Sequence, residues 1–93
     1  MAIAINLEYK PYVALYRRLS DGLRKAILEG RLQLGEPMPS VRELSESLKL
    51  SRATVLKAYE DLRTQGLVVS LSGSGTFVAT TLPGDLGDLL QER

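Results

Sequence analysis

The chain has 93 residues, of which 44% are apolar and 25% charged, and its formal net charge is +1. These values are typical of one small globular domain. The sequence contains no cysteine and no histidine, which excludes disulfides, thiolate metal sites and histidine-dependent acid-base catalysis. The apolar stretch at the start of the chain, Met-Ala-Ile-Ala-Ile, is too short for a signal peptide or a membrane span, and polar residues follow it. A cytoplasmic protein is therefore expected.

The charges are unevenly distributed along the chain. Residues 1–80 hold eleven bases and eight acids, whereas residues 81–93 hold three acids and one base. The basic excess of the first segment is mild, and charge alone does not indicate a nucleic-acid partner. Evidence for a function therefore has to come from local motifs.

The N-terminal third predicts an arm followed by a helix. Residues 2–10 alternate weakly between apolar and polar, as in a short strand or an extended arm, and Pro11 ends this segment. From Tyr12 the apolar residues recur at helical spacing, and Gly30 is expected to follow the helix end, so a helix is predicted over 12–29. The opposite face of this helix is mainly basic and carries Arg17, Arg18, Asp21, Arg24 and Lys25.

A connector and a short second helix come next. Residues 30–39 contain two glycines and two prolines, and three apolar residues of this connector are expected in the core: Leu32, Leu34 and Met38. Ser40 and Glu43 have the spacing of a capping box, in which each side chain satisfies the other residue's backbone amide. The helix that follows is predicted to bury Val41, Leu44 and Leu48.

A third helix and a hairpin complete the predicted fold. Lys49-Leu50 forms the turn, Ser51 caps a helix that runs to about Gln65, and Gly66 ends it. Its buried residues are expected to be Val55, Ala58 or Tyr59, and Leu62. Two β-rich runs, 67–71 and 76–79, flank a Ser-Gly-Ser-Gly turn at 72–75, as in a β-hairpin.

The order of helix, helix, helix and hairpin predicts a mainly α domain with a β-hairpin (α+β), the winged helix-turn-helix. Residues 39–58 are its helix-turn-helix, whose second helix can place its N-terminal end in a DNA major groove. The predicted organisation is an N-terminal arm at 1–11, the winged helix at 12–79, and a linker or the start of a further domain at 80–93.

A series of short motifs follows in a fixed order and spacing over about residues 12–79: Gly30-Arg31-Leu32, Gly35-Glu36-Pro37-Met38-Pro39-Ser40, Arg42-Glu43-Leu44, Ser51-Arg52-Ala53-Thr54-Val55, Ala58-Tyr59, Leu62, Gly66-Leu67 and Gly73-Ser74-Gly75-Thr76-Phe77-Val78. Through these motifs the chain resembles the DNA-binding domain of GntR-family bacterial transcription regulators, and most closely the MocR or YtrA branches. Two positions depart from the family pattern. Lys49 replaces the common glycine of the turn, at a cost of about 1 kcal/mol, and Leu71-Ser72 supplies no basic residue before the wing tip.

The resemblance implies sequence-specific binding of double-stranded DNA, with the third helix in the major groove and the wing at the minor groove. Full-length relatives bind as homodimers, which implies a two-fold symmetric operator. They usually attach a larger effector-binding or dimerisation domain. Since about 14 residues follow the wing, an excised N-terminal domain is expected in preference to a short complete member, and the effector is not identified.

The resemblance implies DNA contacts for two arginines, each with a simpler alternative. Arg52, at the first position of the third helix, would contact base edges, where a guanidinium can bind guanine O6 and N7; otherwise it is a solvated residue that opposes the helix dipole. Arg42 would contact the DNA backbone or an adjacent base. Its alternative is an ion pair with Glu46, worth about 0.3–0.5 kcal/mol.

The remaining candidate DNA contacts are smaller side chains and the wing. Ser51 and Thr54 can offer hydroxyls, although Ser51 is first a helix cap. Ala53 can lie near a thymine methyl group or simply favour the helix, and Lys57 can reach a phosphate or stay solvated. The wing tip contains Ser72, Gly73, Ser74 and Gly75, whose backbone suits a close approach to the sugar-phosphate edge and equally suits any hairpin turn.

Other functions find less support in the sequence. The aromatic residues Tyr12, Tyr16, Tyr59 and Phe77 are expected in the core and not as stacking platforms for single strands. No enzyme activity, cofactor or metal site is expected, because the chain has no histidine, cysteine or paired carboxylates in a predicted cleft. The alternative function is a winged helix for protein interaction or dimerisation, with Leu82, Leu86, Leu89 and Leu90 of the tail docking on a partner.

Overall fold

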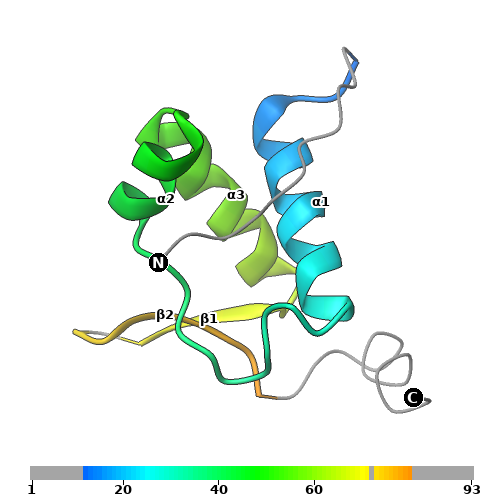
Figure 1. Ribbon diagram of the computed structural model, residues 1–93, viewed down its shortest axis with the longest axis vertical. Helices are drawn as coiled ribbons and strands as arrows, with labels where there is room; N and C mark the ends of the chain where they lie inside the picture. The colour runs from blue at the N-terminus through cyan, green and yellow to red at the C-terminus, as the bar shows by residue number, and fades with distance from the viewer. Residues whose placement is uncertain (1–11, 72, 81–93) are drawn as a thin grey trace.

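The computed structural model describes residues 12–71 and 73–80. It contains three helices and one two-stranded antiparallel sheet, arranged as a winged helix-turn-helix (Figure 1): α1 Leu15–Leu28, α2 Val41–Leu48, α3 Arg52–Thr64, β1 Val68–Leu71 and β2 Gly75–Val78. The predicted fold class is thereby confirmed. The arm at 1–11, the tail at 81–93 and Ser72 lie outside the described residues.

The helix α3 is the centre of the domain, because it contacts α1, α2 and β1. Figure 1 shows α1 and α2 on either side of α3, with the hairpin beneath all three helices. The buried core is formed by apolar residues from every element: Leu19, Leu23, Ala26, Ile27, Leu32, Met38, Leu44, Val55, Ala58, Tyr59, Leu62, Leu67, Val68, Val78 and Ala79. Val41 and Leu48, also predicted for the core, are half-buried and pack against it.

Local sequence signals determine where the helices end. The backbone N–H of Arg31 donates to the carbonyl of Ala26 at 2.9 Å and that of Gly30 to the carbonyl of Ile27 at 3.2 Å, the two bonds of a Schellman motif. Gly30 has a φ of 81°, a conformation that glycine adopts without steric cost. The prediction that Gly30 follows the end of the first helix is confirmed.

The start of the first helix was predicted wrongly. α1 begins at Leu15 and not at Tyr12, because Ala14 has an extended backbone with ψ 146° and serves as the N-cap. Tyr12 therefore precedes the helix and is 99% exposed, which contradicts its predicted place in the core. Tyr16 and Phe77 are half-buried, and Tyr59 is buried as predicted.

The connector between α1 and α2 pairs with the wing, which the sequence did not indicate. Gly35 N–H donates to Val78 O at 3.0 Å, Val78 N–H donates to Glu36 O at 2.8 Å, and Met38 N–H donates to Thr76 O at 2.8 Å. Pro37, which has no N–H to donate, lies opposite Phe77 in this short bridge at the sheet edge. This pairing buries Leu32 and Met38 but leaves Leu34 47% exposed, so the prediction for Leu34 was wrong.

The register of the hairpin places small residues at its tip. β1 and β2 pair with Val68 opposite Val78 and with Leu71 opposite Gly75. Val68 and Val78 are buried beneath the helices, and Leu71 is 52% exposed near the turn. No helix among the described residues is long and apolar enough to cross a membrane.

Candidate nucleic-acid interface

The helix-turn-helix is built from α2, a tight turn and α3. The capping box that starts α2 is present: Ser40 Oγ accepts from the Glu43 N–H at 3.0 Å, and Glu43 Oε1 accepts from the Ser40 N–H at 3.0 Å. This second bond is the main cause that lowers the pKa of Glu43, and the Ser40 side chain adds to it. The carboxylate therefore stays ionised at the helix N-terminus, where the dipole also favours it.

The turn between the two helices depends on a left-handed residue. Lys49 is the C-cap of α2, with φ 58° and ψ 43°, and it is the one non-glycine residue with positive φ among those described. A residue with a Cβ is disfavoured in this conformation. The free-energy cost expected from the sequence for lysine in place of glycine is therefore backbone strain at Lys49. Leu50 N–H donates to Ser45 O at 2.9 Å and closes the turn.

The first turn of α3 exposes the residues predicted to contact DNA. Ser51 is the N-cap, as predicted, and its Oγ accepts from the Thr54 N–H at 3.1 Å. The same Oγ lies 2.8 Å from Thr54 Oγ1, so the two hydroxyls hydrogen-bond to each other. Arg52 and Ala53 are exposed, whereas Thr54 is half-buried. Arg52 and Ala53 are thus the more accessible pair.

The Arg52 guanidinium has no hydrogen bond or ion pair with any described part of the chain. It stands at the N-terminal end of a helix, where the macrodipole disfavours a cation by some tenths of a kcal/mol up to about 1 kcal/mol. The helix beneath it is fixed by the buried residues Val55, Ala58, Tyr59 and Leu62. A helix packed into the core therefore presents to solvent a guanidinium that no described residue pairs with.

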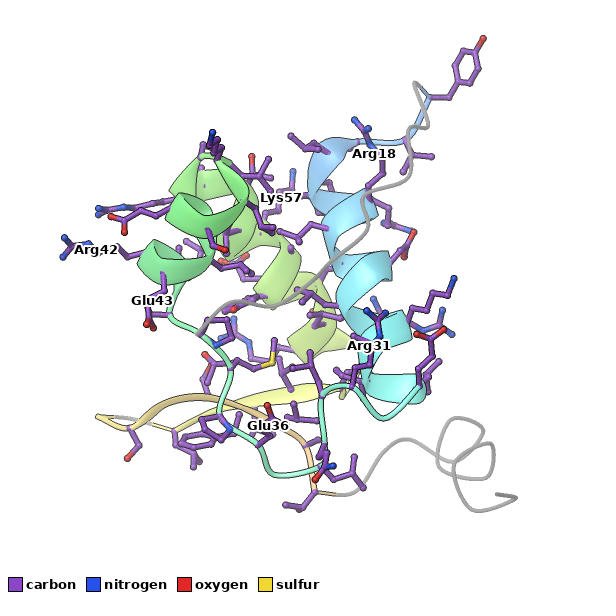
Figure 2. The ribbon with its side chains drawn as sticks, viewed as in Figure 1. Arg18, Arg31, Glu36, Arg42, Glu43 and Lys57 are labelled. Carbon is purple, nitrogen blue, oxygen red and sulfur yellow. The ribbon has the colours of Figure 1, made fainter. Side chains whose placement is uncertain are left out.

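Arg42 also points outward, but it has a partner. Figure 2 shows its side chain extending from α2 away from the rest of the domain. Its Nε lies 3.3 Å from Glu46 Oε1 one turn later, and the two side chains are 72% and 64% exposed. The simpler alternative for Arg42 is thus present in the structure. An ion pair so exposed stabilises the fold by at most about 0.5 kcal/mol. Breaking it so that Arg42 can bind a phosphate therefore costs little free energy.

Lys57 contacts an aromatic ring of α1. Its Nζ lies 4.5 Å from the centre of the Tyr16 ring, and Figure 2 shows the side chain between α3 and α1. Such a cation–π contact is worth about 0.5–1 kcal/mol at an exposed site. The cation–π contact thus holds the Lys57 side chain on the side of α3 that faces α1. The spacing of residues in the sequence did not indicate this contact.

The basic residues of α1 are partly engaged with α3. Arg17 Nε lies 3.9 Å from Asp61 Oδ2, and the Arg17 side chain is 53% exposed. Arg18 is half-buried, and its Nε is buried without a hydrogen-bond partner within the described chain. The Lys25 side chain is exposed to solvent. The predicted basic face is therefore divided between contacts inside the domain and solvent.

The wing tip is open and small. Gly73 has φ 78° and Gly75 has φ 104°, and a Cβ added to either would meet no atom within 4 Å among the described residues beyond its chain neighbours. The glycines are thus required by the turn geometry and not by a close contact inside the domain. Ser74 N–H donates to Leu71 O at 2.9 Å, which closes the turn, and Ser72 lies outside the described residues.

One exposed residue of α3 was absent from the predicted site. Leu56 is 50% exposed and is the one large apolar side chain of α3 that faces solvent. The helical spacing contained this signal, because a stripe formed by Val55, Ala58 and Leu62 excludes position 56 from the core. Leu56 follows Arg52 by one helical turn and therefore shares its exposed face.

The fold and this exposed helix face define a class of protein: winged helix-turn-helix domains with a presented recognition helix. Comparison with known proteins makes the class more specific. Residues 15–78 match the family described as bacterial regulatory proteins, gntR family. The chain therefore belongs to the gntR family of bacterial regulatory proteins.

Individual relatives agree with this membership. The chain is 42% identical over 71 residues to the probable rhizopine catabolism regulatory protein MocR of Rhizobium meliloti, which covers 76% of this chain and 14% of that protein. The structure of YtrA from Sulfolobus acidocaldarius, a GntR-family transcription factor, superposes with a TM-score of 0.76 and 28% identity, over 84% of this chain and 82% of that one. The resemblance to GntR-family regulators is thus confirmed, and proteins named MocR and YtrA are among the relatives. The chain spans about one seventh of the length of the MocR protein.

A third relative is known bound to DNA. The DNA-binding domain of AraR in complex with operator ORX1 has a TM-score of 0.68 and 29% identity to this chain, over 81% of this chain and 96% of that one. The family match over residues 15–78 includes the helix-turn-helix and the wing.

Proposed function

We propose that this chain is the sequence-specific DNA-binding domain of a bacterial transcription regulator, with α3 in the major groove and the wing at the minor groove. The observation that best supports it is Arg52, an exposed guanidinium at the N-terminal end of α3 that has no partner among residues 12–71 and 73–80. Guanine O6 and N7 in the major groove offer the paired acceptors that such a guanidinium binds. The complex of the AraR DNA-binding domain with operator ORX1 supports double-stranded DNA as the partner of this fold.

Each candidate residue receives a role from its position. Arg52 contacts a guanine, and Ala53 lies against a thymine methyl group. Arg42 exchanges its exposed pair with Glu46 for a backbone phosphate. Ser51 and Thr54 already hydrogen-bond to each other, so their contacts to DNA are secondary.

The cation–π contact assigns Lys57 a supporting role. Held over the Tyr16 ring, the ammonium group adds positive potential near the α1 side of α3 and contacts a phosphate there, without reaching base edges. The wing contributes backbone amides at Gly73, Ser74 and Gly75, together with Ser72, to the sugar-phosphate edge. With no basic side chain at the tip, this contribution to the binding free energy is small.

The whole regulator is proposed to be a cytoplasmic homodimer that binds a two-fold symmetric operator. The two α3 helices of a dimer then occupy successive major grooves, one helical turn apart. A single domain binds weakly, because it lacks the second half-site's contribution. The regulator acts by binding and not by catalysis, in keeping with relatives that are named as regulators.

Fluorescence anisotropy tests this function directly. The 93-residue chain is titrated into labelled duplexes, one of random sequence and others selected from a random library, at several salt concentrations. Binding to the selected duplex should be tighter, and log K should fall linearly with log salt at a slope set by the number of phosphates contacted. Absence of binding to any duplex at low salt would contradict the proposal.

A further inference from the structure

The exposed face of α3 contains one apolar side chain that the fold does not require. Leu56 is 50% exposed, whereas the core face of the helix is complete without it. An isolated exposed leucine is common on protein surfaces and needs no function by itself. The significance of Leu56 lies in its neighbours along the helix.

Those neighbours place Leu56 inside the surface proposed to meet DNA. Arg52 and Ala53 lie one turn before it on the same face, and both are exposed. The ammonium group of Lys57, the next residue, is held over the Tyr16 ring on the α1 side. The exposed acid Glu60 follows one turn later, where it would be repelled by phosphates. The DNA-compatible stretch of α3 therefore begins at Arg52 and ends near Leu56.

The chemistry of a leucine limits what it can contact there. It has no hydrogen-bonding group, and it cannot neutralise a phosphate. The thymine C5-methyl is the apolar group on the base edges of the major groove. A rise of 1.5 Å per residue puts Leu56 about 6 Å beyond Arg52 along the helix, roughly two base-pair steps of 3.4 Å.

We infer that Leu56 packs against a thymine methyl group, within about two base pairs of the base pair that Arg52 contacts. This inference rests on the proposed DNA-binding function and adds a preference for an A·T pair at one defined position. Leu56 is thus a specificity-determining residue, distinct from Ala53 one turn earlier.

Deoxyuridine substitution tests the contact on the full chain. In the duplex selected above, each thymine is replaced in turn by deoxyuridine, which keeps all hydrogen-bonding groups and removes only the methyl. At one thymine the replacement should weaken binding of the wild-type chain about fourfold, as expected for about 0.8 kcal/mol per buried carbon. In Leu56→Ala the same replacement should have no effect.

Two further variants make the result specific. Leu56→Asn keeps a similar size without the apolar surface, and it should also become insensitive to that methyl group. Leu34→Ala removes an equally exposed leucine, 47% against 50%, outside the proposed interface, and it should retain the fourfold effect. Circular dichroism confirms that each variant is folded.

The outcomes separate this inference from the proposed function. If the chain binds its selected duplex and no thymine is sensitive to methyl removal, the inference is wrong and the proposed function stands. The same conclusion follows if Leu56→Ala and Leu56→Asn keep the sensitivity of the wild-type chain, since the methyl then contacts another residue. If no duplex is bound at all, both fail together.

Discussion

The hydroxyl of Tyr59 donates a 2.7 Å hydrogen bond to the carbonyl oxygen of Pro39 and so ties α3 to the residue just before the cap of α2. Tyr59 is 6% exposed and Pro39 is buried, so neither group can be solvated in place of this bond. Burial raises the pKa of Tyr59, and the nearby negative charge of Glu43 raises it further. The hydroxyl therefore keeps its proton and remains a donor at any ordinary pH. The bond therefore helps to fix the angle between the two helices of the helix-turn-helix.

Tyr59→Phe should destabilise the domain. The substitution keeps the ring but leaves the Pro39 carbonyl without a partner in a buried position, which costs about 1–3 kcal/mol. Urea unfolding measures the free energy of unfolding. The matched control is Tyr12→Phe, at a tyrosine that is 99% exposed, and it should leave this free energy unchanged. Equal effects of the two variants would show that the hydrogen bond to Pro39 does not stabilise the fold.

Arg52→Ala should weaken binding to the selected duplex by about 1–3 kcal/mol and binding to random duplexes much less. The reason is that a guanine contact discriminates between sequences, whereas a phosphate contact does not. Anisotropy titrations measure both affinities. Arg31→Ala removes an equal charge in the turn after α1, where Arg31 pairs with Glu29 at 2.9 Å, and it should alter both affinities only slightly. A uniform loss on all duplexes would assign Arg52 to the DNA backbone instead.

Glu43→Gln should make the domain less sensitive to acid. The folded pKa of Glu43 is lowered by its hydrogen bonds with Ser40, so the ionised carboxylate stabilises the fold above its unfolded pKa, which is about 4.3. That stabilisation is lost as the pH falls from about 4.3 through the lower folded pKa. Urea unfolding at pH 6 and at pH 3 should therefore show a smaller difference for Glu43→Gln than for the wild type.

Glu60→Gln is the control for the acid experiment. Glu60 is an exposed helical glutamate that takes no part in a capping box. Its variant should retain the wild-type loss of stability at low pH. If Glu43→Gln and Glu60→Gln behave alike, the capping box does not contribute to the pH dependence.

Lys49→Gly should stabilise the domain by about 1 kcal/mol, because glycine adopts the φ of 58° without the clash that a Cβ causes. Lys49→Ala removes the same charge and keeps the Cβ, so it should not stabilise. Thermal and urea unfolding compare the three proteins. A stabilisation shared by both variants would point to the charge of Lys49 and not to its backbone.

The sequence by itself determined where most elements start and end. The capping box of Ser40, the cap at Ser51 and the glycines Gly30 and Gly66 act through backbone hydrogen bonds that span three to five positions, and all four lie where they were predicted. Arg52 and Ala53 were likewise predicted at exposed positions of the third helix, since the apolar stripe of a helix also determines its opposite face.

The tertiary structure alone decided which side chains near those elements face solvent and which find distant partners. Tyr12 and Leu34 are exposed, Lys57 lies over Tyr16, and the connector pairs with β2. Each outcome depends on residues about 40 positions away, or on the few backbone angles that orient a connector. Periodicity along the chain reports only the helix or strand itself, so it contains no information about the surface against which that element packs.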